Sequence, residues 1–149
     1  MRYLVDTNVL TRMAEPGHAM YPTALGATVQ LGQDGHELYL VPQVFYEFWV
    51  VSTRPVAVNG LGLQPAAAAS ELTRLRSLFL WLDDTPAIYP VWERLVSSRG
   101  VMGKKAHDAR LVAAMVVHGL TDLLTFNDQE FRVYGEIDAW TPARILGRS

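Results

Sequence analysis

The sequence predicts an α/β protein in which helices cover both faces of a central, mostly parallel sheet, an α/β/α sandwich. Short apolar runs rich in strand formers, such as residues 37–41, alternate along the chain with longer segments of helical length. This alternation is typical of a parallel sheet with helical crossovers. A carboxylate, Asp6, follows the first apolar run, which is where open α/β sheets place their ligand sites.

The N-terminal half of the chain is predicted to contain two strands and four helices. The predicted strands are residues 3–5 and 37–41, and the predicted helices are residues 9–13, 22–31, 43–53 and 65–78. Pro16 and Gly17 end the first helix, because together they are a strong helix stop. Pro65 begins the fourth helix, since proline is favoured at the first helical position.

The C-terminal half continues the same alternation up to an edge strand. The predicted strands are residues 80–82, 122–125 and 137–140, and the predicted helices are residues 87–98, 107–118, a short one after Asn127 and a terminal one from Thr141-Pro142. Gly119 is placed as a helix stop. No interdomain linker interrupts the chain, so we expect one domain over residues 1–149.

The composition excludes several classes of function. There is no Cys, which excludes disulfide and thiolate chemistry, and the four His lack zinc-ligand spacing. No apolar run has membrane-spanning length and no signal-type segment is present, so we expect a soluble, cytoplasmic protein with no membrane association. The net charge of -2 means that contact with nucleic acid would need local basic patches or a bridging metal ion.

Glu47 lies in the middle of the strongly apolar segment 43–53. A helix that is apolar on nearly every side is expected to be buried. A buried carboxylate is costly unless it is paired, neutralised or bound to metal. Glu47 is therefore a candidate ligand, and the alternative is an ion pair with Arg54 or another cation.

Acidic and amide side chains recur where the predicted strands end. Asp6 follows the first strand, Glu47 follows the second, Asp108 opens a helix, and Asn127-Asp128 follow the strand at 122–125. Because parallel strands end at one edge of a sheet, these groups are expected to converge, and they would repel unless they share a cation. Oxygen ligands suit Mg²⁺ or Mn²⁺, which activate water for phosphodiester hydrolysis. Helix capping by Asn127 and a favourable helix-dipole position for Asp108 are the alternatives.

At these residues the chain resembles the PIN-domain ribonucleases, and within them the VapC-type toxins of bacterial toxin–antitoxin pairs. The similar pieces are residues 4–10, the helix with Glu47, residues 107–113 and residues 123–128. The resemblance implies an endoribonuclease that depends on Mg²⁺ or Mn²⁺, forms a homodimer and is inhibited by a small cognate antitoxin bound near the acidic cleft. Asp6, Glu47 and Asp108 match the family's three most constant acidic positions.

The fourth acidic position of the family is expected at Asp128, with Asn127 orienting a neighbouring carboxylate or water and Glu130 as the alternative. We expect Asp6, Glu47, Asp108 and Asp128 to be the catalytic and metal-binding residues. The supporting residues are expected to be Thr7, Asn8, Thr125 and Asn127. The RNA backbone is expected to contact Lys104, Lys105 and Arg110, which otherwise are plain surface.

Two other functions compete with a nuclease. A catalytically silent PIN fold would bind RNA or protein without cutting, but it would not need all of its acidic positions. A phosphotransfer or receiver domain would need a lysine at the end of a late strand, and none is found. A homodimer is also favoured by an apolar excess that a small sheet does not need, at Phe45, Trp49, Phe79 and Trp81.

Overall fold

The computed structural model of the protein describes residues 1–147, and a parallel sheet forms its centre. Within these residues the sheet has five strands in the order β3-β2-β1-β4-β5, and every neighbouring pair is parallel. The strands are β1 (Arg2–Val5), β2 (Glu37–Leu40), β3 (Leu80–Trp81), β4 (Asp122–Leu124) and β5 (Asp138–Trp140). The predicted α/β class is therefore confirmed, and the last strand is an edge strand as predicted.

Helices connect the strands, and each predicted helix is present within two residues of its predicted start. The α-helices are α1 (Thr7–Met13), α2 (Tyr21–Gln33), α3 (Pro42–Thr53), α4 (Pro65–Leu78), α5 (Ile88–Arg99), α6 (Lys105–His118) and α7 (Pro142–Gly147). The short 3-10 helices are η1 (Val56–Val58) and η2 (Asp128–Phe131). Proline occupies the first turn of α2, α3 and α4, where its missing N–H has no helical partner to lose.

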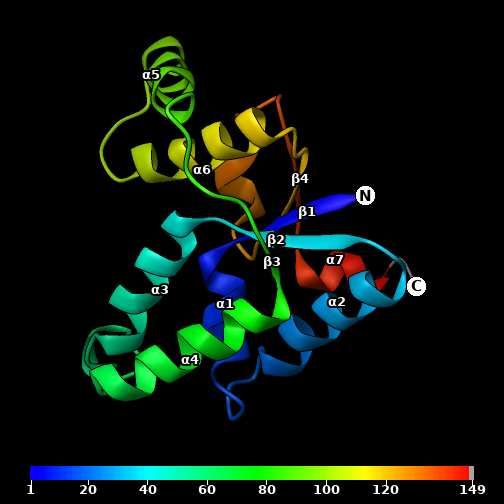
Figure 1. The fold of residues 1–149 in the computed structure, drawn as a ribbon, viewed down its shortest axis with the longest axis vertical. Coiled ribbons are helices and arrows are strands. Elements are labelled where there is room, and N and C mark those ends of the chain that lie inside the picture. The colour runs from blue at the N-terminus through cyan, green and yellow to red at the C-terminus, as the bar shows by residue number, and fades with distance from the viewer. Residues whose placement is uncertain (148–149) are drawn as a thin grey trace.

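The helices cover the sheet from both sides, as the sandwich prediction requires. Figure 1 shows α5 and α6 above the sheet in this view and α1, α2 and α7 below it. α5 packs on α6, and α2 packs on both α1 and α7. α3 contacts both α1 and α4. In Figure 1, α3 and α4 lie together to the lower left of β2 and β3.

The core is built around the two central strands. Tyr3, Leu4 and Val5 of β1 are fully buried, and so are Leu123 and Leu124 of β4. A parallel strand with a neighbour on each edge and helices on each face has no exposed side, which explains its continuous apolar run. No helix within residues 1–147 is both long enough and apolar enough to cross a membrane.

The expectation that α3 is buried on nearly every side is wrong. Phe45 is buried, but Tyr46 is 66% exposed and Val50 is 56% exposed. The reason is that α1 and α4 cover only part of this helix. Glu47 therefore lies half-buried at the border between the covered and the open face.

The carboxyl ends of the strands share one edge of the sheet. Val5 pairs with Leu124 at the end of the central pair of strands, and the N–H of Asp6 donates to the Leu124 carbonyl at 2.9 Å. The residues that follow β1 and β4, Asp6 and Thr125, are thereby brought side by side. The N-terminal turn of α1 starts at the same edge, where ligand sites of open sheets lie.

Candidate active site

A cavity of about 590 Å³ opens at the carboxyl edge of the sheet. Ligand pockets typically measure about 300–1,000 Å³, so this one is large enough for part of a nucleotide chain. Its wall is formed by the turn between β1 and α1, by α1 and α3, by the loop after α3, and by single residues of α6 and of the turn after β4. Asp6, Glu47 and Asp108 all line it, so three of the four predicted acidic residues share one cavity.

Asp6 caps α1 and is 8% exposed. Its Oδ1 accepts a hydrogen bond from the Thr7 N–H at 2.7 Å, and its Oδ2 accepts one from the Thr125 hydroxyl at 2.8 Å. Burial raises the pKa of Asp6 to about 7, opposed by these two hydrogen bonds and assisted by the charges of Glu47 and Asp108. The side chain thus caps the helix, although its ionised form is destabilised by burial.

Thr125 fixes the position of the Asp6 carboxylate. Its hydroxyl donates to Asp6 and accepts from the Asn8 amide at 3.2 Å and from the Asn127 N–H at 3.0 Å. The Asn8 Oδ1 accepts from the Phe126 N–H at 3.1 Å, which ties α1 to the turn after β4. The predicted supporting residues of these two segments form one hydrogen-bonded unit.

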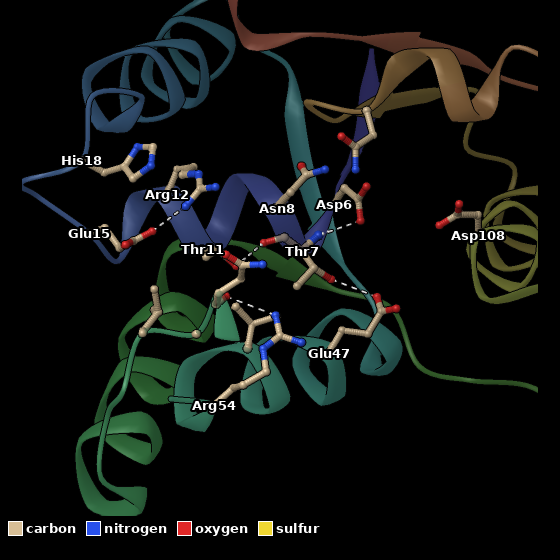
Figure 2. A pocket seen from close by; sticks show the side chains of 15 residues that line it. Asp6, Thr7, Asn8, Thr11, Arg12, Glu15, His18, Glu47, Arg54 and Asp108 are labelled. Carbon is tan, nitrogen blue, oxygen red and sulfur yellow. Dashed lines mark hydrogen bonds and ion pairs between the residues drawn. The ribbon is translucent and has the colours of Figure 1, made fainter. Parts of the chain in front are cut away.

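Glu47 reaches the cavity from the middle of α3. The Thr7 hydroxyl donates to its Oε1 at 3.0 Å, so the first residue of α1 holds this carboxylate (Figure 2). The alternative ion pair with Arg54 is absent from the described residues, because Arg54 donates instead to the Asn59 carbonyl at 3.2 Å.

Asp108 faces the other two carboxylates across the cavity, from the first turn of α6 (Figure 2). It is half-buried. Burial raises its pKa to about 6, and the charges of Glu47 and Glu130 add to that rise, while His107 and Lys105 oppose it. A negative charge in the first turn of a helix is favoured by the helix dipole, and Asp108 has this position. The dipole does not explain why this carboxylate faces two others.

The chemistry of this donor set fits Mg²⁺ or Mn²⁺, because every acidic ligand offers oxygen. Burial raises the pKa values of Asp6 and Asp108, and the charge of Glu47 adds to both rises. A shared dication would remove this repulsion between carboxylates. Within residues 1–147, no three histidine or acidic side chains are already arranged around a metal position. Asp6 and Glu47 are held by hydroxyl groups, so side-chain rotation is needed before all three converge on an ion.

The candidates for the fourth position lie apart from one another. Asn127 lines the cavity. Asp128 begins η2 and forms an ion pair with Arg132 at 3.2 Å, and it is not among the residues that line the cavity. Glu130 is exposed, and its charge contributes to the raised pKa of Asp108. The fourth carboxylate stays a prediction.

The three predicted RNA-binding cations surround the N-terminal half of α6 without lining the cavity. Lys104 is exposed just before the helix. The Lys105 Nζ lies 3.8 Å from a carboxylate oxygen of Glu130. The Arg110 guanidinium lies 3.2 Å from a carboxylate oxygen of Asp84. These cations are positioned beside the acidic cavity rather than inside it.

The cavity contains cations that the sequence interpretation missed. Arg12 lines it at the end away from the three carboxylates, and Arg54 lines it nearer to Glu47. A signal was available for Arg12, since it follows Asn8 by four residues in α1, a spacing that keeps both on one helix face.

Comparison with known proteins finds relatives by family and by fold. The sequence matches the family described as PIN domain over residues 3–137. No curated protein matches it. The fold is similar to VapBC2 from Rickettsia felis, solved bound to promoter DNA, with 16% identity, coverage of 95% of this chain and 98% of that chain, and a TM-score of 0.68.

Two further solved structures have a similar fold. VapC20 from Mycobacterium tuberculosis, described as a toxin that cleaves the sarcin-ricin loop, is 20% identical, with coverage of 91% of this chain and 98% of that chain and a TM-score of 0.61. PAE2754 from Pyrobaculum aerophilum is 22% identical, with coverage of 99% and 94% and a TM-score of 0.63.

Proposed function

Because this chain belongs to the PIN-domain family, we propose that it is a metal-dependent endoribonuclease and the toxin of a toxin–antitoxin pair. One observation supports the reaction most strongly. Asp6, Glu47 and Asp108 come from three separate elements, line one cavity, and have no ion-pair partner within residues 1–147. Carboxylates kept together without such a partner are typical of a functional site.

We propose that Asp6, Glu47 and Asp108 hold Mg²⁺ or Mn²⁺, with Asp128 as a fourth carboxylate. When bound, such an ion polarises a phosphate oxygen and lowers the pKa of water, which is the chemistry that phosphodiester hydrolysis requires. An Asp128 ligand would have to leave its ion pair with Arg132.

The chain's own residues contribute positioning. Thr125 holds one oxygen of Asp6, and the Thr7 hydroxyl holds one oxygen of Glu47, so each carboxylate keeps its other lone pairs for a ligand. The bonds that join Asn8 to Thr125 and Phe126 connect α1 to the turn after β4 beside the Asp6 carboxylate.

The proposed substrate is RNA, held beside the cavity by Lys104, Lys105 and Arg110. Lys105 is well suited to this role because its side chain is 71% exposed and its contact with Glu130 is long, at 3.8 Å. Exposed pairs of this kind contribute little stability and exchange readily for a phosphate. Since RNA is the proposed substrate, we place the protein in the cytoplasm.

We also propose a small antitoxin partner, a homodimer, and one domain over residues 1–149. The antitoxin is supported by solved structures of similar fold that are toxin–antitoxin complexes, such as the one from Klebsiella pneumoniae. The dimer is supported by the exposed apolar side chains of Tyr46 and Val50 on α3.

Incubation of the purified protein with mixed RNAs, followed by mapping of the cut sites, tests the proposal. We expect cuts with Mg²⁺ or Mn²⁺ and none in EDTA. Asp108→Asn is expected to abolish cleavage and to keep the fold, as judged by circular dichroism. Asp138→Asn, at an exposed carboxylate on β5, is the matched control and is expected to cut like the wild type.

Two results would contradict this assignment in different ways. Cleavage that persists in EDTA would indicate a metal-free ribonuclease mechanism. RNA binding without any cleavage would favour the catalytically silent PIN-fold module.

A further inference from the structure

Asp6, Glu47 and Asp108 lie toward one end of the cavity, and Arg12, Glu15 and His18 lie toward the other (Figure 2). Arg12 lies at the far end and is paired with Glu15 at 2.7 Å. His18 lies beside them, and its Nδ1 accepts from the Met20 N–H at 3.0 Å. These groups are occupied by protein partners, so they leave little free positive charge there.

Arg54 differs from these groups. Figure 2 shows its guanidinium entering the cavity from the end of α3, between Glu47 and the far end. Within residues 1–147 it has no carboxylate partner, and one of its NH₂ groups donates to the Asn59 carbonyl at 3.2 Å. Its Nε is buried and has no hydrogen-bond partner in the same part of the chain. The guanidinium is thus held by one hydrogen bond and is not neutralised by a carboxylate in the described part of the chain.

The loop after α3 is folded tightly around Arg54. The N–H of Gly62 donates to the Arg54 carbonyl at 2.9 Å, and the N–H of Leu61 donates to the Val51 carbonyl at 3.0 Å. A Cβ on Gly60 would lie 1.9 Å from the Arg54 carbonyl oxygen, so only glycine fits there. Asn59 has a left-handed backbone with φ 65, which places its carbonyl against the guanidinium. The loop thus holds both the backbone of Arg54 and, through the Asn59 carbonyl, its guanidinium.

We propose that Arg54 binds a backbone phosphate of the RNA that neighbours the phosphate being cleaved. This inference rests on the proposed ribonuclease function. Among the described residues, Arg54 lines the cavity without a carboxylate partner, so a polyanionic strand that extends past the three carboxylates meets an unneutralised cation there. A guanidinium held in a fixed plane binds two phosphate oxygens at once, which a surface lysine does not.

The test is a set of RNA oligonucleotides that span one mapped cut, each with a single uncharged methylphosphonate linkage at a different position beside the cut. kcat/KM is measured for the wild type, for Arg54→Gln and for the control Arg94→Gln. Arg94 is exposed on α5 and is not among the residues that line this cavity. Arg54→Lys and thermal unfolding of each variant check that the loop still folds.

We expect the wild type and Arg94→Gln to lose about tenfold in kcat/KM at one particular linkage, which is the size of a lost charged hydrogen bond. Arg54→Gln is expected to be about tenfold slower on unmodified RNA and to lose nothing further at that linkage, while Arg54→Lys keeps a reduced effect. Equal losses in the wild type and in Arg54→Gln at every linkage would overturn the role of Arg54 and would leave the proposed ribonuclease function standing. Absence of cleavage by the wild type would overturn the proposed function and this assignment with it.

Discussion

Asp6 combines two requirements that oppose each other. Its hydrogen bonds from Thr7 and Thr125 favour the ionised carboxylate, because both are donated to its oxygens. Burial and the neighbouring charges of Glu47 and Asp108 favour the neutral acid, and the net result is a pKa raised to about 7. At neutral pH the burial and the neighbouring charges destabilise the ionised carboxylate, which is why we interpret the arrangement as a binding feature.

We predict that, in metal-free buffer, the free energy of unfolding falls as the pH rises from 5 to 8. A carboxyl whose folded pKa lies above its unfolded value binds more protons when folded, so its contribution is present at low pH and is lost as the pH passes the folded pKa. The shift of Asp6 from 3.8 to about 7 corresponds to on the order of 4 kcal/mol over that whole pH window, of which about 3 kcal/mol lies above pH 5. Asp108, with its pKa raised to about 6, acts in the same direction.

Urea denaturation in EDTA at several pH values measures this fall. Asp6→Asn is expected to flatten the dependence, whereas Asp138→Asn is expected to keep it. Identical slopes in wild type and Asp6→Asn would show that Asp6 does not titrate in this range.

A second prediction at this scale concerns the fourth acidic position. Asp128→Asn is expected to raise the Mn²⁺ concentration needed for half-maximal cleavage, and Glu130→Gln is expected to leave it nearly unchanged. Titration of both variants while cleavage is followed makes the comparison. The reverse ranking would transfer the role to Glu130, whose charge already reaches Asp108. No effect from either would leave a site of three carboxylates.

Among the elements, the sequence predicted best where a local signal begins or ends a segment. α4 has the predicted bounds, because Pro65 begins it and the apolar strand that follows limits it. α3 shows where such reasoning stops. Its apolar run contains no information on how many of its faces other elements cover, so the exposure of Tyr46 and Val50 was missed.

The same distinction applies to the site. Asp6 and Asp108 were predicted because a strand end and a helix start fix their places in any parallel sheet. The location of Arg54 in the cavity depends on the fold of the loop after α3, where the close contact at Gly60 and the backbone of Asn59 decide it. Such tertiary contacts leave no periodic pattern in the sequence.

The start of α6 is expected to contact the RNA backbone. We predict that replacing Lys104 and Lys105 by Gln weakens RNA binding and reduces the slope of log affinity against log salt by about one to two, because each lost phosphate contact releases about one counterion fewer. Binding to a noncleaved RNA at several salt concentrations measures the slope. An unchanged slope would assign both lysines to plain surface.

At the scale of the whole molecule, the apolar excess divides into core and surface. Phe45 and Trp81 pack against each other, with ring centroids 5.1 Å apart, so they belong to the fold. Trp49, Val50 and Leu80 remain 36%, 56% and 46% exposed. The surface that favours a homodimer is therefore smaller than the sequence suggested.

We predict that the protein sediments as a dimer at micromolar concentration and that Val50→Glu shifts it toward the monomer, since a charge in an apolar interface is costly. Val56→Glu, at a side chain that is 72% exposed in η1, is the control and is expected to leave the dimer unchanged. A monomeric wild type would defeat the dimer proposal.

The central claim is that Asp6, Glu47 and Asp108 together bind one kind of divalent ion. Calorimetric titration with Mn²⁺ at pH 8 tests it most directly, because it needs neither an RNA substrate nor an antitoxin. We predict saturable binding by the wild type and by Asp138→Asn, and affinity at least about tenfold weaker for Asp6→Asn, Glu47→Gln and Asp108→Asn, because each loses a charged oxygen ligand. Equal Mn²⁺ affinity in all five proteins, or no binding by the wild type, would contradict the account.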